Sequence, residues 1–112
     1  MIGMAVTDAT SAAPLAEPRP ADIRLEAVLG ALSDPVRLFI VRALAASEGE
    51  SRSCGSFGLS VSKSTASHHF RVLREAGVIR QHDEGRKRMT ELRRSDLDAR
   101  FPGLLDSVIT AV

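Results

Sequence analysis

Residues 62–77 read SKSTASHHFRVLREAG and carry a clear helical pattern. At about 100° per residue, Ala66, Phe70 and Leu73 fall on one side of a helix. The opposite side, between about 140° and 200° away, carries the polar residues Ser64, His68, Arg71 and Glu75. A cap at Ser62 and a left-handed glycine at Gly77 fit the two ends. The stretch therefore predicts a helix over residues 62–76 with one side in the core and the other in solvent.

A β-hairpin is predicted directly after this helix. Residues 78–82 and 86–92 form two short extended runs, and Asp83, Glu84 and Gly85 form the turn between them. Three consecutive cations, Arg86 to Arg88, come just after the turn. A helix followed directly by a two-stranded hairpin, here over residues 78–92, is the arrangement of a reading helix and its wing.

The rest of the chain predicts more helices. Apolar residues at helical spacing indicate helices over residues 22–33, 35–46 and from about 95 onward, the last interrupted or restarted at Pro102. Ser33, Asp34 and Pro35 are a strong helix start. The expected apolar stripes are Leu25, Val28, Leu29 and Leu32 in the first helix, and Val36, Phe39, Ile40, Ala43 and Leu44 in the second. Residues 47–52 form a loop, and residues 53–57 allow a short helical segment.

These elements predict a mainly α winged helix-turn-helix fold with about five helices and a two-stranded wing. Residues 1–20 contain three prolines and show no sustained apolar period, so they predict a flexible N-terminal tail. We expect residues 21–112 to form one DNA-binding and dimerisation domain.

Length and composition indicate the number of domains and the cell compartment. The chain has 112 residues and one cysteine, which suits a single domain that folds without disulfides. No apolar run is long enough for a membrane span, and no secretory signal is evident. We therefore expect a cytoplasmic protein that does not bind membranes.

Charge is uneven along the chain. Residues 1–34 carry two arginines and five acids, a net charge of −3, whereas residues 60–94 carry nine bases and four acids, a net charge of +5. A basic segment beside an acidic one is typical of a protein that meets phosphates on one side. The hydroxyls, imidazole and guanidinium on the polar side of helix 62–76 suit base edges in a major groove. The sequence thus predicts that the partner is double-stranded DNA.

The motifs LSDPVR (32–37), SKSTASHHFRVLREAGVI (62–79) and EGR (84–86) together resemble the ArsR/SmtB family of bacterial transcriptional repressors. The resemblance covers about residues 22–109. It implies a homodimer built from the first and last helices that represses by blocking a palindromic operator and responds to an effector. The DNA contacts that helix and resemblance indicate are Ser62, Lys63, Ser64, Thr65, Ser67, His68 and Arg71, with Arg86 and Lys87 in the wing.

The sequence departs from the family at its sensor sites. Many members bind metals through a Cys-x-Cys pair before the reading helix, where this chain has Cys54 alone. Others use Asp and His on the last helix, but no histidine follows His82 here. No metal site or other cofactor is predicted, although a metal effector stays open. Cys54 is a candidate sensor by redox chemistry or by sharing a site across a dimer, or else a small core residue.

Other interpretations stay open. The chain could keep the fold and act mainly through a protein partner or co-regulator, an interaction module rather than an operator-binding repressor. An enzyme is not expected, because the sequence has no nucleophile motif or phosphate loop. His68 and His69 diverge by about 100° on a helix, which disfavours a metal pair and predicts DNA contact for His68 and partial packing for His69.

Overall fold

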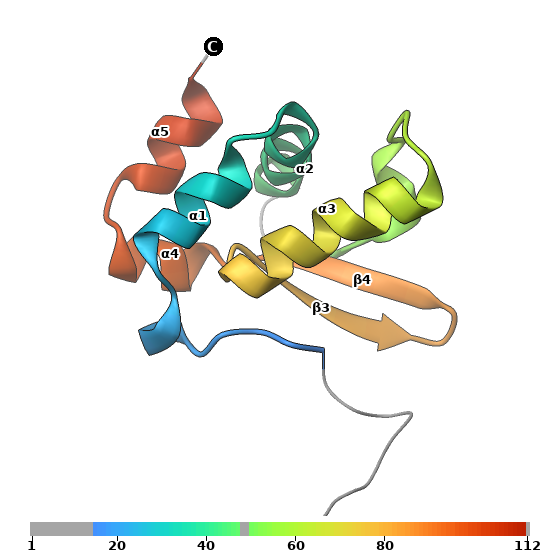
Figure 1. Cartoon of the computed structure of the whole chain (residues 1–112), viewed down its shortest axis with the longest axis horizontal. Helices are drawn as coiled ribbons and strands as arrows, with labels where there is room; N and C mark the ends of the chain where they lie inside the picture. The colour runs from blue at the N-terminus through green and yellow to red at the C-terminus, as the bar shows by residue number, and fades with distance from the viewer. Residues whose placement is uncertain (1–14, 48–49, 112) are drawn as a thin grey trace, which may run out of the picture.

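The computed structural model describes residues 15–47 and 50–111, and within these ranges it shows five α-helices and a three-stranded antiparallel sheet (Figure 1). The helices are α1 (Leu25–Leu32), α2 (Pro35–Ala46), α3 (Lys63–Ala76), α4 (Arg94–Arg100) and α5 (Leu104–Thr110), with 3-10 helices η1 (Pro20–Asp22) and η2 (Cys54–Phe57). The strands are β2 (Arg52–Ser53), β3 (Ile79–Glu84) and β4 (Lys87–Leu92). The predicted winged helix-turn-helix fold is confirmed.

Local signals set the two central helices. Asp34 caps α2, since its Oδ2 accepts hydrogen bonds from the backbone N–H groups of Val36 (2.9 Å) and Arg37 (3.1 Å). The bond from Arg37 holds the pKa of Asp34 below its usual value. Ser62 caps α3 by accepting from the N–H of Thr65 (3.2 Å), and Gly77 ends it at φ 88°. The predicted starts and ends of both helices are confirmed to within a residue.

The predicted hairpin forms, but its turn is shorter than expected. Glu84 pairs with Lys87, so only Gly85 and Arg86 form the turn, with Gly85 at φ 61°. The prediction that Asp83 and Glu84 belong to the turn is wrong, because both pair across the hairpin and extend β3. The sheet also contains β2, which pairs with β4 and was not predicted.

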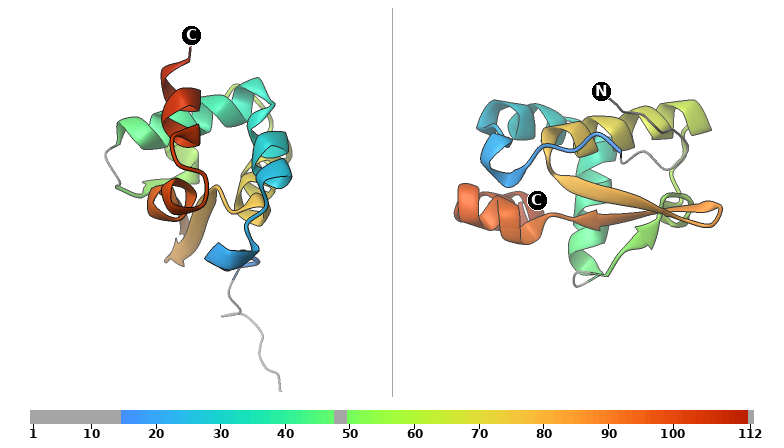
Figure 2. Two further views of the ribbon diagram at one scale, coloured as in Figure 1. Left: turned by 90° about the vertical axis from the view of Figure 1, so that its left-hand side faces the viewer. Right: turned by 90° about the horizontal axis from the view of Figure 1, so that it is seen from below.

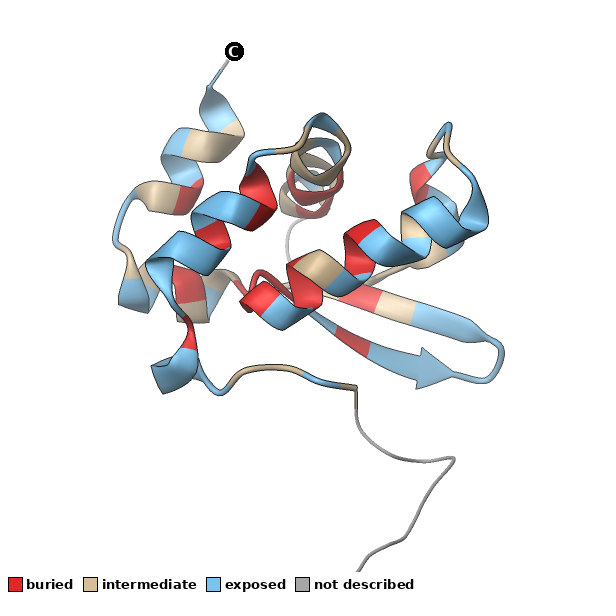
Figure 3. Ribbon diagram, viewed as in Figure 1, coloured by how far each residue is buried: buried red, intermediate tan, exposed pale blue. Residues whose placement is uncertain are grey.

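The core lies between α1, α2, α3 and the base of the hairpin (Figures 1 and 3). Ile40 and Leu44 of α2, Leu73 of α3 and Ile79 of β3 are almost completely buried. The predicted buried stripe of α2 is partly wrong, because Phe39 is 52% exposed, and in the apolar stripe of α1 Leu25 and Leu29 are 44% and 47% exposed. The buried face of α1 is rotated from this stripe.

Phe39 was expected in the buried stripe of α2, whereas the stripe of α1 was expected only to need a partner that covers it. The residues that do face inward are Val28, Ala31 and Leu32 on α1, and Ile40, Val41 and Leu44 on α2. Leu25, Leu29 and Phe39 remain accessible to solvent in the described chain.

The segment before α1 lies against the domain. Residues 15–19 have no regular secondary structure, but they accept hydrogen bonds from Arg74, Arg93 and Gln81. Arg74 Nε donates to Ala16 O (3.1 Å), Arg93 Nη1 donates to Pro18 O (2.8 Å), and the backbone N–H of Gln81 donates to Glu17 Oε2 (2.8 Å). Part of the segment predicted as a flexible tail is thus held by α3 and the hairpin, while residues 1–14 of that segment lie outside the described residues.

The C-terminal helices form as two short pieces. Pro102 and Gly103, the latter at φ 83°, separate α4 from α5, as the interruption at Pro102 predicted. The start differs slightly: α4 begins at Arg94, before the expected cap at Ser95 and Asp96. Among the described residues, no helix has the length and apolar character to span a bilayer.

Two views at right angles show how these pieces are placed. The hairpin tip projects from one end of the molecule, and α4 and α5 lie at the other end, together with α1 (Figures 1 and 2). The helix α3 runs along the side of the hairpin and contacts both α1 and β3. The fold thus presents α3 and the hairpin together and keeps the C-terminal helices away from them.

Candidate nucleic-acid interface

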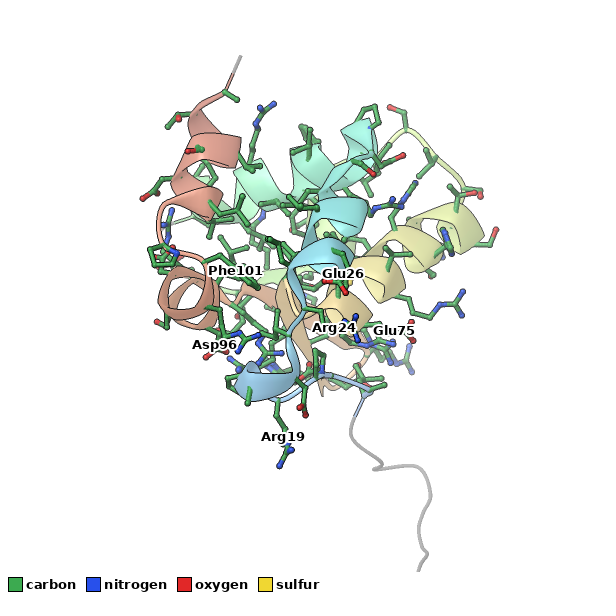
Figure 4. All side chains as sticks on the ribbon, turned by 60° about the vertical axis from the view of Figure 1, so that its left-hand side comes forward. Arg19, Arg24, Glu26, Glu75, Asp96 and Phe101 are labelled. Carbon is green, nitrogen blue, oxygen red and sulfur yellow. The ribbon has the colours of Figure 1, made fainter. Side chains whose placement is uncertain are left out.

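The helix α3 has the two-sided character that its sequence predicts. Phe70 and Leu73 are buried and Ala66 is partly buried against the core. The polar positions Ser64, His68, Arg71 and Glu75 are all exposed. Glu75 lies in the last turn of the helix (Figure 4), far from the residues of its first turn. The exposed face near the start of α3 is therefore free of acidic residues.

Aromatic and polar contacts fix the inner face of α3. The rings of Phe70 and Phe57 lie 5.5 Å apart and are tilted by 56°, which joins α3 to η2. Arg37 of α2 donates from Nη1 to Nδ1 of His69 (3.0 Å) and from Nε to the carbonyl of Ala31 (2.6 Å). His69 is only 9% exposed, more buried than the partial packing that we expected. A helix held at several points can present its outer face without rearranging.

Hydroxyl groups at the start of α3 bond to one another. Ser62 Oγ donates to Thr65 Oγ1 (2.9 Å) while accepting from the Thr65 backbone N–H, and Ser62 and Ser64 hydroxyls lie 3.2 Å apart. Ser67 is exposed one turn farther along. Two of the predicted contact residues, Ser62 and Thr65, thus also form the helix cap.

His68 and Arg71 lie together on the outer face. Arg71 Nη2 is 3.4 Å from His68 Nδ1, and both side chains are exposed. A guanidinium can donate two parallel hydrogen bonds to guanine, and an imidazole can donate or accept. This pair is the most distinctive donor set on the helix.

The wing carries fewer free cations than its sequence indicates. Arg88 donates to both carboxylate oxygens of Asp83 (2.8 and 3.3 Å), its cross-strand partner. The hydrogen bond from Arg88 lowers the pKa of Asp83, and the bond to Asp83 raises the pKa of Arg88. Arg86 in the turn and Lys87 at the start of β4 remain exposed.

Other cations of the basic segment, residues 60–94, are also paired with acids. Arg80 lies within 4.0 Å of Glu17, Glu91 and Asp96, and Arg93 and Arg94 also pair with acids. Within the described residues, the exposed cations of residues 60–94 that have no acid within 4.0 Å are Lys63, Arg71, Arg86 and Lys87. All four are on α3 or the wing. The sequence count of +5 included arginines that the fold neutralises, but the remaining charge is concentrated where we predicted it.

A cleft of about 540 Å³ lies between η2, α3 and the hairpin. Cys54 lines it, and the Cys54 Sγ lies 3.2 Å from Gln81 Nε2 and 3.4 Å from Thr90 Oγ1. Gln81 Oε1 in turn accepts from Arg74 Nη1 (2.7 Å). Sequence reasoning missed this buried network, whose members come from α3, both hairpin strands and η2.

The residues near the two familiar sensor positions do not fit a metal ion. The neighbours of Cys54 are an amide and a hydroxyl, neither of which is a ligand that thiolate-bound metals favour. In the C-terminal helices, Asp98 and Asp106 pair with Arg94, and Asp96 pairs with Arg93. In the part of the chain that the structure describes, no three His, Cys, Asp or Glu side chains come together.

Comparison with known proteins agrees with this geometry. A family model described as a helix-turn-helix domain matches residues 32–82. Over 83 residues the chain is 39% identical to the uncharacterised HTH-type transcriptional regulator YceK of Bacillus subtilis (strain 168). The match covers 72% of this chain and 82% of that protein.

Solved structures share the fold. The chain matches an ArsR family transcriptional regulator at 22% identity (TM-score 0.60, 67% of this chain and 81% of that one). It matches the transcriptional repressor BigR from Xylella fastidiosa at 24% identity (TM-score 0.54, 69% and 85%). It also matches a possible transcriptional regulator for arsenical resistance at 28% identity (TM-score 0.59, 75% and 84%). The chain therefore belongs to the HTH-type transcriptional regulators, which bind DNA, and it shares its fold with an ArsR family member.

Proposed function

We propose that this regulator is a homodimeric repressor that recognises a palindromic operator by inserting α3 into the major groove, with the wing beside it. The observation that carries the proposal is the placement of the free cations on the surface of α3 and the wing: Lys63, Arg71, Arg86 and Lys87 are exposed and have no acid within 4.0 Å in the described residues. Such a surface neutralises phosphates on one side of the molecule. A chromosomal operator would place this activity in the cytoplasm.

The proposed contacts divide into two kinds. His68 and Arg71 lie on the outer face of α3 and would contact base edges, which specify sequence. The other proposed contacts would position the helix on the backbone: Ser62, Lys63, Ser64, Thr65 and Ser67 from α3, and Arg86 and Lys87 from the wing. Small hydroxyl residues at the start of α3 let the backbone approach a phosphate closely.

The dimer is proposed from the exposed apolar residues of α1. Leu25 and Leu29, one turn apart, are 44% and 47% exposed, and α5 lies at the same end of the molecule with Val108 and Ile109 only partly buried (Figures 1 and 2). Pairing two chains there would bury these residues and leave α3 and the wing free. A two-fold dimer reads two half-sites about 34 Å apart on one face of DNA.

Fluorescence anisotropy tests the proposal. The full chain is titrated against a labelled duplex from the promoter upstream of its own gene and against a shuffled duplex of equal length, at about 150 mM salt. We expect binding to the promoter at least about 10³-fold tighter, the lower end for specific regulators. Equal affinity for both duplexes would refute the repressor and favour action through a protein partner. The proposal assigns no catalytic step to the chain, since its relatives are named as regulators.

A further inference from the structure

The cleft between η2, α3 and the hairpin has the size of a small-molecule site. Its volume of about 540 Å³ falls within the range of about 300–1,000 Å³ that such sites occupy. Its walls come from three separate elements: Cys54 from η2, Lys63 and Phe70 from α3, and Arg86 and Arg88 from the hairpin. A ligand there would contact both the proposed reading helix and the wing.

The charge of the lining is strongly one-sided. Four cations line the cleft, Lys63, Arg74, Arg86 and Arg88, against a single acid, Asp83. Arg88 already holds that acid through two hydrogen bonds. The other three cations have no carboxylate within 4.0 Å in the described ranges 15–47 and 50–111. The cleft therefore has an excess of positive charge that the protein itself does not balance.

Arg74 is the most unusual of these cations because it is buried. It is only 8% exposed, yet its guanidinium donates to two neutral oxygens, Ala16 O (3.1 Å) and Gln81 Oε1 (2.7 Å). A buried charge without a counter-charge is unfavourable, and an anion near the guanidinium would relieve it. Hydrogen bonds from Gln81 to Thr90 and Cys54 hold the amide that orients Arg74.

Part of the remaining lining is apolar. Phe70 and Ala66 contribute to one wall, and Phe57 packs behind Phe70. Inorganic phosphate alone would leave this wall in contact with water, whereas a ligand with an aromatic or aliphatic body would cover it. The combination favours an organic anion over a simple ion.

We propose that this cleft binds a small organic anion, with a carboxylate, sulfonate or phosphate among the cations of the lining and an apolar body against Phe70. The same inference, which rests on the proposed function, makes the anion a competitor of DNA, because Lys63 and Arg86 serve both ligands. Occupancy would neutralise the cations that meet the phosphate backbone. The anion is thus the effector that releases the operator.

Cys54 allows direct detection of occupancy, since it lines the cleft and is the only cysteine of the chain. Alkylation of the DNA-free full chain by iodoacetamide, a neutral reagent, is followed by mass spectrometry with 1-anilinonaphthalene-8-sulfonate as the probe. N-phenyl-1-naphthylamine, which has the same aromatic body without the sulfonate, is the matched control. We expect the sulfonate to slow alkylation at least about fivefold and the neutral amine to leave it nearly unchanged. Equal rates with and without the sulfonate would overturn the site.

Charge variants locate the anion. Lys63→Gln and Arg86→Gln should each raise the half-protecting sulfonate concentration about three- to tenfold. Arg24→Gln removes the same charge from an exposed position outside the lining and should leave it unchanged. An equal effect of all three variants would show only a general charge effect and refute the site.

An experiment with DNA distinguishes the anion site from the proposed repressor function. The sulfonate is added to the protein on its labelled promoter duplex, and release of the duplex at the concentrations that protect Cys54 supports competition. Protection of Cys54 without release would keep the site and refute its role as effector. Protection by a protein that does not prefer its promoter would refute the repressor and keep the anion site.

Discussion

Gly77 joins the proposed reading helix to the wing, and its replacement by alanine tests how tightly that junction is built. Its φ is 88°, a conformation that residues with a side chain rarely adopt. A Cβ at this position would lie 2.7 Å from Ile23 Cγ1, 3.0 Å from Ile23 Cδ1 and 3.1 Å from Pro18 Cγ. Because Ile23 is completely buried, it cannot swing away into solvent.

The expected loss has two parts. The left-handed backbone costs alanine about 1–2 kcal/mol, and overpacking against a buried side chain adds about 1–3 kcal/mol. Gly77→Ala should therefore lower the free energy of unfolding by about 2–5 kcal/mol. Gly103 is the matched control: its φ is 83°, but a Cβ there would meet no atom within 4 Å. Gly103→Ala should lose only the backbone part, about 1–2 kcal/mol.

Urea and thermal unfolding followed by circular dichroism measure both variants. At about 4–8 °C per kcal/mol for a domain of this size, the two melting temperatures should differ by at least about 4 °C. Ile23→Ala removes the two nearest atoms, so adding Gly77→Ala to it should cost about as little as Gly103→Ala. Equal losses in Gly77→Ala and Gly103→Ala, or strict additivity with Ile23→Ala, would refute the close-contact explanation.

Four further outcomes are expected. Arg71→Ala should weaken promoter binding by about 1–3 kcal/mol in anisotropy while binding to shuffled duplex changes less; equal losses on both would contradict base contact. Lys87→Ala should reduce the slope of log affinity against log salt by about one, and an unchanged slope would exclude a phosphate contact. Asp34→Asn keeps the helix cap but removes the titrating group. Because the pKa of Asp34 is lowered in the folded state, its carboxylate stabilises the fold above about pH 4. Below that pH the wild type should therefore lose more stability than the variant in acid titrations, and parallel curves would contradict this. Leu29→Glu should shift the sedimentation profile from dimer to monomer, and an unaltered dimer would place the interface elsewhere.

The sequence predicts well those features that depend on neighbours along the chain. The start of α2 follows from Asp34 and Pro35 alone, and the two faces of α3 follow from its apolar period. Both signals are local, so no knowledge of the tertiary structure is needed. The exposure of Ser64, His68 and Arg71 was therefore predicted correctly, while their contact with DNA stays a prediction.

Features set by distant partners were missed. The pairing of β2 with β4 joins residues about 37 apart, and Arg52 and Ser53 give no strand signal of their own. The two-residue turn depends on the register that pairs Glu84 with Lys87, since Gly85 suits several turn lengths. The same register pairs Asp83 with Arg88, so a correct turn assignment would have shown that one wing cation is neutralised.

The exposed apolar residues show a different limit. Leu25, Leu29 and Phe39 fit an amphipathic stripe, but a helical stripe wider than the inner surface that covers it leaves its margin accessible. The spacing of apolar residues in a sequence indicates which of them share one side of a helix. It does not indicate which residues on that side are buried. The burial of Arg74 was missed for the converse reason, because its partners Ala16 and Gln81 come from other parts of the chain.

The contact of Glu17 with the backbone N–H of Gln81 has a practical consequence. Within the described sheet β3 is an outer strand, and an outer strand with free N–H groups is a template on which other chains can add. The Glu17 carboxylate occupies one of these groups and Pro18 lies beside it. A version shortened to residues 21–112 would retain every α-helix and still lose this protection. We expect such a version to aggregate edge to edge, so the segment at residues 15–18 should be kept in any shortened form.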